Sequence, residues 1–364
     1  MSEEKLLSAE RIYLQKDDND PLSAINKLFC PWMVRDRFGL LNKYSPYRLS
    51  DIADDVPAPF EQYRPIATIL DEVALRMLGN HERITVSWSG GVDSTSVIVA
   101  LLRNMSDEDR KRLTIICSQS SCEENPKFYQ MMVSMGLHII VSEDLLKALS
   151  EVETDVITSG WCADQLYGSD INLAYPAAYN MHWIDALKYI WEVKNGTRLG
   201  DKSAAAIERI YQGYAHNLGV ELTDFCEFAW MFNFGCKFSY IRNIMRCQLA
   251  GTKNQEKTEG FFDDILFQRW SIGNFENIKH VNIYERPRHY KHALKLYIYE
   301  YTEDEAYYRD KGKRNSWGMS HIPVRDFTVV TESNELKTYR YKDKKIDLDT
   351  LGALNAFVRK EYRR

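Results

Sequence analysis

Residues 84–94 of this chain read Ile84-Thr85-Val86-Ser87-Trp88-Ser89-Gly90-Gly91-Val92-Asp93-Ser94. The first five residues of this stretch form an apolar, β-rich run, and an apolar helical run from Thr95 to Leu102 follows the stretch. A strand, a Gly-Ser loop and a helix in this order form a cradle for phosphate, because glycines let the backbone approach closely and the first helix amides point at the anion. The helix dipole favours negative charge at the same end.

The loop also carries an acid, Asp93, which would repel a bare phosphate. An acid at this position makes sense if it holds Mg²⁺, an ion that bridges carboxylate and phosphate oxygens. The loop differs from a Walker A loop, because no lysine follows its glycines. The plainer interpretation is a Gly-Ser turn that only connects a strand to a helix.

The order Ser-Gly-Gly-x-Asp-Ser at residues 89–94 resembles the PP-loop of the ATP pyrophosphatases. The resemblance implies an enzyme that cleaves ATP between its α- and β-phosphates and transfers AMP to a substrate oxygen. It also implies nucleotide contacts from the whole loop, which are Ser89, Gly90, Gly91, Val92, Asp93 and Ser94.

Short strand and helix patterns alternate around this loop. The predicted strands are Ile84–Trp88, Leu113–Cys117, Leu137–Val141 and Asp155–Thr158. The predicted helices are Ile66–Leu78, Ser94–Asn104, Asn125–Met135 and Glu143–Ser150. Alternating elements with continuous apolar strands predict an α/β fold, a Rossmann-like parallel sheet with helices on both faces, and a ligand at the carboxyl ends of the strands.

The chain divides into four segments by pattern. Residues 1–60 mix short apolar pieces with prolines and indicate loops and short helices that cover another part of the protein. Residues 61–174 hold the nucleotide-binding core, and residues 175–330 form a mainly helical lobe rich in aromatic residues. Residues 331–364 indicate a short strand or loop at Leu336–Tyr341 and a final amphipathic helix at Leu348–Tyr362.

A second motif, Thr158-Ser159-Gly160-Trp161-Cys162-Ala163-Asp164-Gln165-Leu166-Tyr167-Gly168-Ser169, follows the last predicted strand. It resembles the Ser-Gly-Glu-Gly-Ala-Asp-Glu-Leu-Phe-Gly-Gly segment of asparagine synthetase and β-lactam synthetase. The resemblance implies that Asp164 joins Asp93 in binding Mg²⁺ and that Gly160 belongs to the cofactor site. Two carboxylates from neighbouring strand ends can share one divalent ion that also holds the triphosphate.

The departures from that family concern the substrate. The family's Glu is Trp161 here, the following Gly is Cys162, and its second acid is Gln165. We therefore expect these three residues to line the acceptor pocket, and we do not expect the family's aspartate specificity. Family analogy also places the adenine of ATP near the end of the second strand, at Cys117 and Ser118.

Later segments supply candidate cations. The stretch His289-Tyr290-Lys291-His292-Ala293-Leu294-Lys295 resembles the family's Lys-x-x-Leu-Arg segment, and Tyr308-Arg309-Asp310-Lys311-Gly312-Lys313 resembles its late Arg-x-Lys segment. In the family a late lysine neutralises the departing pyrophosphate. The resemblance makes Lys311 the first catalytic candidate, with Lys313 and Lys295 beside it. The plain alternative for each is a surface lysine.

Composition narrows the class of protein. The chain has 364 residues, a net charge of −5 and seven cysteines with no Cys-x-x-Cys pair, which favours reduced thiols over a disulfide frame or a zinc ribbon. We find no secretory leader and no apolar run of about 18 residues, so we expect a cytoplasmic protein without membrane contact. Residues 281–364 hold 18 Lys and Arg against 13 Asp and Glu, and this basic part could meet phosphates.

We expect an ATP- and Mg²⁺-dependent, adenylate-forming amide ligase that acts on a small-molecule acceptor. The family's glutaminase half begins with a cysteine after Met1, and this chain has Ser2, so the nitrogen would come from ammonia, an amine or a separate glutaminase. One alternative is a PP-loop enzyme that modifies a nucleobase in tRNA, DNA or a free nucleotide. Another is a degenerate ATP-binding sensor or scaffold. Whether the chain forms a homo-oligomer stays open.

Overall fold

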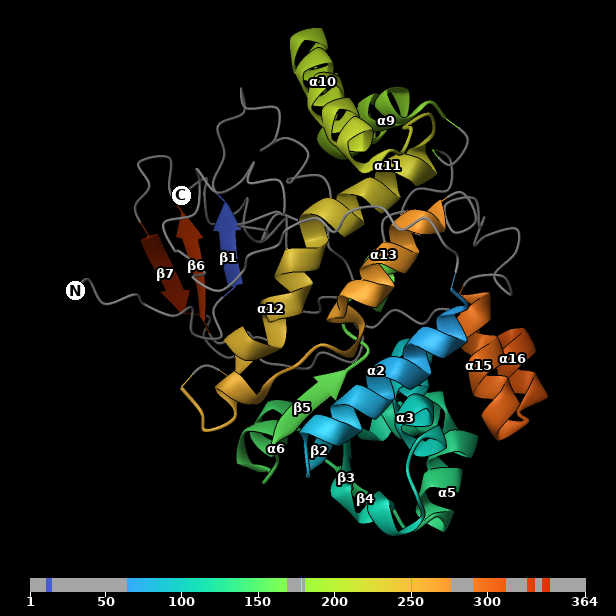
Figure 1. Cartoon of the computed structure of the whole chain (residues 1–364). Helices are drawn as coiled ribbons and strands as arrows, with labels where there is room; N and C mark the ends of the chain where they lie inside the picture. The colour runs from blue at the N-terminus through green and yellow to red at the C-terminus, as the bar shows by residue number, and fades with distance from the viewer. Residues whose placement is uncertain are drawn as a thin grey trace.

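A computed structural model describes residues 64–168, 178, 181–249, 251–275 and 291–311, together with three strands at 11–14, 326–330 and 336–340. Two sheets and a set of helices make up this part of the chain (Figure 1). The predicted helix 348–362 lies outside the described residues.

The larger sheet has four parallel strands in the spatial order β4-β3-β2-β5. These strands are β2 (Ile84–Trp88), β3 (Leu113–Cys117), β4 (His138–Val141) and β5 (Val156–Ser159). The chain steps outward from β2 to β4 and then returns to the other side of β2. The predicted Rossmann-like sheet is confirmed, and its direction of winding reverses between β2 and β5.

Alternate residues of the strands enter two different apolar cores. Val86 and Ile115 pack in the larger core, which includes side chains of α2 (Ile66–Asn80) and α3 (Val92–Arg103). Ile116 and Ile157 pack in a second core with α6 (Leu145–Glu151) and α12 (Phe238–Gln248). Because successive side chains of a strand point to opposite faces, helices cover both faces of the sheet, which explains the continuous apolar strands.

The remaining helices complete the layers. Those near the sheet are α4 (Gln119–Glu124), α5 (Pro126–Ser134), α7 (Ala163–Tyr167), α13 (Ile265–Gly273), α15 (His292–Thr302) and α16 (Glu305–Asp310). Those of the upper lobe in Figure 1 are α9 (Trp183–Asn195), α10 (Asp201–Leu218) and α11 (Phe225–Phe232). The described residues between 181 and 311 are mostly helical, and β6 at Asp326–Val330 is a strand within the segment 175–330.

A single π-helical turn, Asn233–Lys237, joins α11 to α12. Figure 1 shows the combined helix running from the upper lobe down toward β5. Trp183 of α9 stacks on Phe228 of α11 with ring centroids 5.2 Å apart, and Tyr211 of α10 meets the same Phe228 edge-on. These three aromatic side chains are buried and form part of the core of the lobe.

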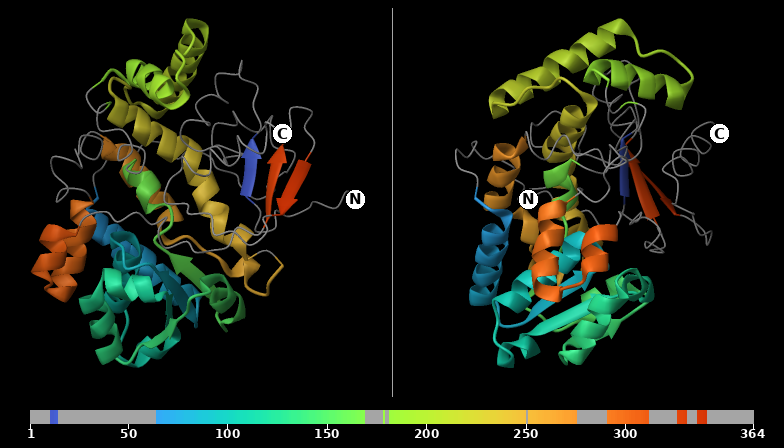
Figure 2. Two further views of the ribbon diagram at one scale, coloured as in Figure 1. Left: turned by 180° about the vertical axis from the view of Figure 1, so that it is seen from behind. Right: turned by 90° about the vertical axis from the view of Figure 1, so that its right-hand side faces the viewer.

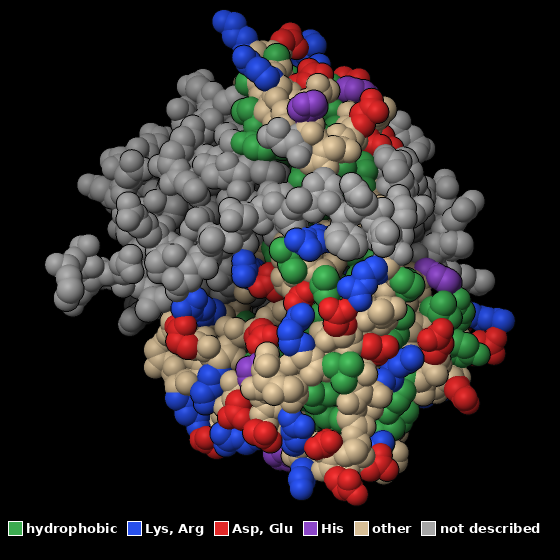
Figure 3. Space-filling view, viewed as in Figure 1, with side chains coloured by type: hydrophobic (Ala, Val, Ile, Leu, Met, Phe, Trp, Pro, Cys, Tyr) green, Lys and Arg blue, Asp and Glu red, His purple; other side chains and the backbone are tan. Residues whose placement is uncertain are grey.

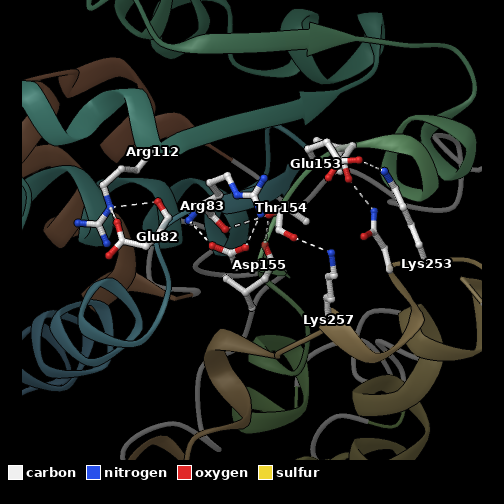
Figure 4. A network of polar contacts seen from close by, with 11 residues as sticks. Glu82, Arg83, Arg112, Glu153, Thr154, Asp155, Lys253 and Lys257 are labelled. Atoms are coloured by element: carbon white, nitrogen blue, oxygen red, sulfur yellow. Dashed lines mark hydrogen bonds and ion pairs between the residues drawn. The ribbon is translucent and has the colours of Figure 1, made fainter.

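A polar network fastens the segment around residues 253–257 to the amino ends of β2 and β5 (Figure 4). Asp155 accepts hydrogen bonds from the backbone amide and the guanidinium of Arg83, at 3.0 and 2.7 Å. Lys257 Nζ donates to the Thr154 carbonyl at 2.8 Å, and Lys253 forms an ion pair with Glu153. The network ties residues 253–257 to the sheet at the amino ends of the strands, opposite their carboxyl ends.

The second sheet joins the two ends of the chain. Strand β1 (Arg11–Leu14) pairs parallel with β6 (Asp326–Val330), and β6 pairs antiparallel with β7 (Leu336–Arg340). Figure 2 shows the three strands side by side, apart from the larger sheet. Loops and short helices were expected for residues 1–60, so the strand β1 corrects that prediction. The four residues of β1 pair with β6, which lies near the other end of the chain. Strand β7 agrees with the short strand expected at 336–341.

Within the described residues, no helix combines the length and the apolar character that a membrane span requires.

Candidate active site

Both predicted motifs lie at the reversal point of the sheet. The loop Ser89–Gly91 follows β2, and residues 160–162 follow β5, its neighbour. In open parallel sheets the connections after two such strands turn to opposite faces and leave a crevice where ligands bind. The topology therefore brings together two segments that are about 70 residues apart in the chain.

The first loop is held in shape by its own serines. Ser94 Oγ accepts a hydrogen bond from the Ser89 amide at 3.1 Å and lies 3.0 Å from Ser89 Oγ. Gly90 has φ +78°, a left-handed conformation that favours glycine, and a β-carbon there would lie 2.5 Å from the Ser121 carbonyl oxygen. Within the described residues no side chain caps the first turn of α3. The start of a helix favours an anion, because its dipole places partial positive charge there.

The second loop packs directly on the first. A β-carbon on Gly160 would lie 2.5 Å from both Asp93 Cβ and the Ser94 amide nitrogen. Only a residue without a side chain lets the end of β5 come this close to the first turn of α3. This contact sets the spacing between Asp93 and the following helix α7, which carries Asp164.

Helix α7 is fixed from behind by the helical lobe. Trp230 Nε1 donates to the Leu166 carbonyl at 3.1 Å, and Ser271 Oγ donates to the same oxygen at 2.6 Å. Trp230 is fully buried in α11, and Ser271 lies in α13. The lobe therefore holds the short helix that presents Asp164.

One ammonium group joins the two acids. Lys291 Nζ lies 2.5 Å from both carboxylate oxygens of Asp93 and 2.6 Å from Asp164 Oδ1. The Lys291 side chain is 2% exposed, and the two carboxylates are 23% and 26% exposed. Burial alone would lower the pKa of Lys291, but the charges of Asp164 and Asp93 outweigh burial and hold this pKa above the ordinary lysine value. Lys291 is therefore a cation in this arrangement.

A second ion pair lies beside the phosphate loop. Lys311, directly after α16, forms an ion pair with Glu124, the last residue of α4, and both side chains are nearly buried. A β-carbon on Gly91 would lie 4.0 Å from Glu124 Oε1, so this carboxylate borders the glycine loop. Lys295 is buried one turn after Lys291 in α15. Burial, and then the charges of Lys311 and Lys291, lower the pKa of Lys295 to about 8.

The residues expected at the adenine are engaged in local structure. Cys117 is fully buried with its Sγ 3.7 Å from Cys122 Sγ, and burial raises the pKa of the Cys117 thiol to about 12. Ser118 Oγ accepts a hydrogen bond from the Ser121 amide at 3.2 Å and caps α4. These side chains support the end of β3, so an adenine contact here would come from the backbone.

The three residues expected to line the acceptor pocket differ in accessibility. Trp161 is partly exposed and packs against both cores. Cys162 is 1% exposed with φ +70°, and Gln165 is 3% exposed. Of the three, Trp161 is the one whose side chain reaches the surface.

The structure brings together most of the predicted site and adds two residues. Asp93, Asp164 and the loop residues 89–94 meet at one point, and Lys311 lies close enough to Lys295 to contribute to the lowered pKa of Lys295. Lys313 lies outside the described residues. Sequence reasoning missed Lys291 and Glu124 as site residues. The Lys-x-x-Leu pattern at 291–294 could have indicated Lys291, whereas nothing in the sequence around Glu124 indicated a role.

The acids fit a magnesium ion held partly by a nucleotide. Among the described residues, no three His, Cys, Asp or Glu side chains gather into a group that could hold a metal. Mg²⁺ is usually bound by one or two carboxylates together with substrate phosphates and waters. Asp93 and Asp164 both reach a single cation, the Lys291 ammonium, so they meet this requirement.

Comparison with known proteins adds little about the function of this site. No protein-family model matches the chain, and no curated protein matches it. Among solved structures, NMN synthetase from Francisella tularensis is similar at 13% sequence identity, over 70% of this chain and 99% of that one, with a TM-score of 0.19. A likeness at this level shows nothing about function.

Proposed function

We propose that this protein is an ATP-dependent, adenylate-forming enzyme that cleaves ATP to AMP and pyrophosphate. The observation that carries the proposal is the meeting of Asp93 and Asp164 on one cation beside the Gly90–Gly91 loop. Two acids and a glycine loop at the start of a helix suit a metal-bound triphosphate. The resemblance of both motifs to the PP-loop synthetases supports the same reaction.

In the proposed reaction an acceptor oxygen attacks the α-phosphorus of ATP. The bond from that phosphorus to the oxygen bridging the α- and β-phosphates breaks, and pyrophosphate leaves with the electron pair. The α3 amides and the ammonium groups of Lys311 and Lys291 stabilise the charge that develops on the phosphate oxygens. Mg²⁺, when held by Asp93 and Asp164, supplies further positive charge at these oxygens. Lys295 is a third candidate cation.

The second half of the proposed reaction forms an amide. The nitrogen of ammonia or an amine attacks the activated carbon, AMP departs with its oxygen, and the nitrogen loses a proton. The acceptor supplies a carboxylate or carbonyl oxygen. The partly exposed Trp161 stands where the similar synthetases have a glutamate, so we propose an acceptor with an apolar part.

The nucleobase-modifying alternative would need a basic surface if its substrate were a nucleic acid. On the described part of the face shown in Figure 3, Lys and Arg side chains are interspersed with Asp and Glu. This face gives that alternative no support, so we place a small-molecule acceptor first.

The test is the product of ATP consumption. The protein is incubated with ATP, Mg²⁺, ammonia and pooled metabolites or nucleotides, and the nucleotides are separated by chromatography. AMP with pyrophosphate supports the proposal, and the depleted compound names the acceptor. ADP with phosphate contradicts it, and tight ATP binding without turnover favours the sensor or scaffold.

Replacing Asp93 by Asn tests the assigned metal site. Once an acceptor is known, D93N should slow ATP–pyrophosphate exchange by about a hundredfold or more, the range that a lost electrostatic group commonly produces. Asp155 forms its ion pair at the opposite edge of the sheet, so D155N is the matched control and should retain exchange. Full exchange in D93N would remove the metal role.

A further inference from the structure

The phosphate site carries its own counter-charges. Lys291 forms ion pairs with both Asp93 and Asp164, and Lys311 forms an ion pair with Glu124 beside the glycine loop. Every one of these five side chains is nearly or largely buried, so solvent screens the charges weakly. The ligands of the proposed reaction must therefore enter a site whose charges are already paired.

A lone divalent cation meets a specific obstacle here. Its carboxylate ligands both contact Lys291 Nζ, at 2.5 and 2.6 Å, and a cation between them would have to displace that ammonium. The displaced Lys291 would then lie buried beside a dication without its acidic partners, which costs free energy. A phosphate that arrives with the cation removes this cost, because it offers the displaced ammonium an anionic partner.

We propose that Lys291 holds the Asp93–Asp164 pair closed to free divalent cations, so that metal and triphosphate enter this site together. Lys291 then sets what the site accepts: a metal–nucleotide complex, in preference to the metal alone. The inference rests on the proposed function, because it takes the two acids as metal ligands.

The first experiment measures Mn²⁺ binding to the full chain by electron paramagnetic resonance, with no nucleotide present. Wild-type protein should bind Mn²⁺ weakly. Replacing Lys291 by Met should tighten Mn²⁺ binding by about tenfold, within the usual range of coupling between two sites. K253M removes a lysine from an ion pair at the far edge of the sheet and should behave like wild type. Equal Mn²⁺ affinity in wild type and K291M would overturn the inference.

A second experiment uses only wild-type protein, in case K291M does not fold. Thermal unfolding is followed with Mg²⁺ alone, with α,β-methylene-ATP in excess EDTA, and with both Mg²⁺ and the analogue. We expect a rise in Tm only with the pair, because a ligand stabilises the folded state appreciably only when its concentration exceeds its Kd. A full shift from Mg²⁺ alone would overturn the inference while leaving nucleotide binding intact. No shift from the pair would instead contradict the proposed function.

Discussion

Tyr297 of α15 donates a 2.5 Å hydrogen bond from its hydroxyl to Asp71 Oδ1 of α2. The same carboxylate oxygen accepts a hydrogen bond from Asn104 at 2.8 Å, and the Arg103 guanidinium lies 4.5 Å from the centre of the Tyr297 ring. Helix α15 carries Lys291 at its start and Lys295 one turn later. The Tyr297–Asp71 bond therefore docks the helix that supplies two of the site's cations.

Replacing Tyr297 by Phe should loosen this docking. The change removes one of the two hydrogen bonds that Asp71 Oδ1 accepts, leaving that of Asn104, and should lower the free energy of unfolding by about 1 kcal/mol. Urea unfolding measures the loss, with Y299F as control, since Tyr299 stacks on Tyr308 at the outer side of the same helix. An unchanged free energy in Y297F would show that the Tyr297–Asp71 hydrogen bond does not contribute to the docking of α15.

Replacing Gly160 by Ala should force the two loops apart. The new methyl group would lie 2.5 Å from Asp93 Cβ and the Ser94 amide, and backbone cannot yield as a flexible side chain can. We expect a loss of about 1–3 kcal/mol in stability, the usual cost of overpacking, and weaker binding of Mg²⁺ with α,β-methylene-ATP.

Gly213 provides the control for that change. It lies inside α10 with nothing within 4 Å of an added β-carbon. G213A should therefore stabilise the protein by about 0.5–1 kcal/mol, because alanine loses less conformational entropy in a helix. Equal unfolding curves for G160A and wild type would contradict the tight contact.

Lys295 should make stability depend on alkaline pH. Its pKa is about 8 in the folded protein against an ordinary 10.5, so between these values the unfolded chain binds more protons than the folded one. The free energy of unfolding therefore rises with pH between about 8 and 10.5. Below about pH 8 the charged Lys295 destabilises the folded protein by its full amount. K295M should be more stable than wild type near pH 7, by on the order of 2–3 kcal/mol.

The extra stability of K295M over wild type should shrink as the pH approaches 10.5. Urea unfolding of K295M and wild type between about pH 7 and 10.5 measures this difference. K188M, which removes a partly exposed lysine of α9, should follow the wild-type pH profile. If K295M were less stable than wild type at every pH, the Lys295 ammonium would be a net stabilising group.

Replacing Glu124 by Gln should free the charge of Lys311 for a phosphate. The pair is nearly buried and borders the glycine loop. Equilibrium dialysis without metal should show tighter pyrophosphate binding in E124Q, by about fivefold or more, whereas K311M should bind it more weakly. Weaker binding in both variants would mean that Glu124 positions the loop and does not compete with the anion.

The local sequence pattern was enough to predict the bounds of the strands that are buried on both faces. Strands β2 and β3 were predicted to the residue, because apolar and β-branched residues dominate both runs and a serine follows each of them. Helix α4 was missed, since its sequence Gln-Ser-Ser-Cys-Glu-Glu has no apolar period. The Ser118 cap, which bonds the Ser121 amide, helps to form it.

The site residues that lie within the two motifs were predictable from the sequence. Asp93 and Asp164 were paired from their motifs, and the winding of the sheet brings them together. Lys291 was missed although the Lys-x-x-Leu pattern includes it, because that pattern does not say how α15 docks on α2 and α3. Strand β1 was missed for a related reason, since its partner lies at the other end of the chain.

The pairing of β1 with β6 imposes an order on biosynthesis. Arg11 lies opposite Phe327, so the first strand leaves the ribosome long before its partner exists. At about 5–20 residues per second the delay is on the order of tens of seconds. During that time the four parallel strands and their helices can assemble, while the strand at residues 11–14 waits with unpaired backbone groups. The nascent chain would therefore close its smaller sheet last, after the nucleotide-binding layer has formed.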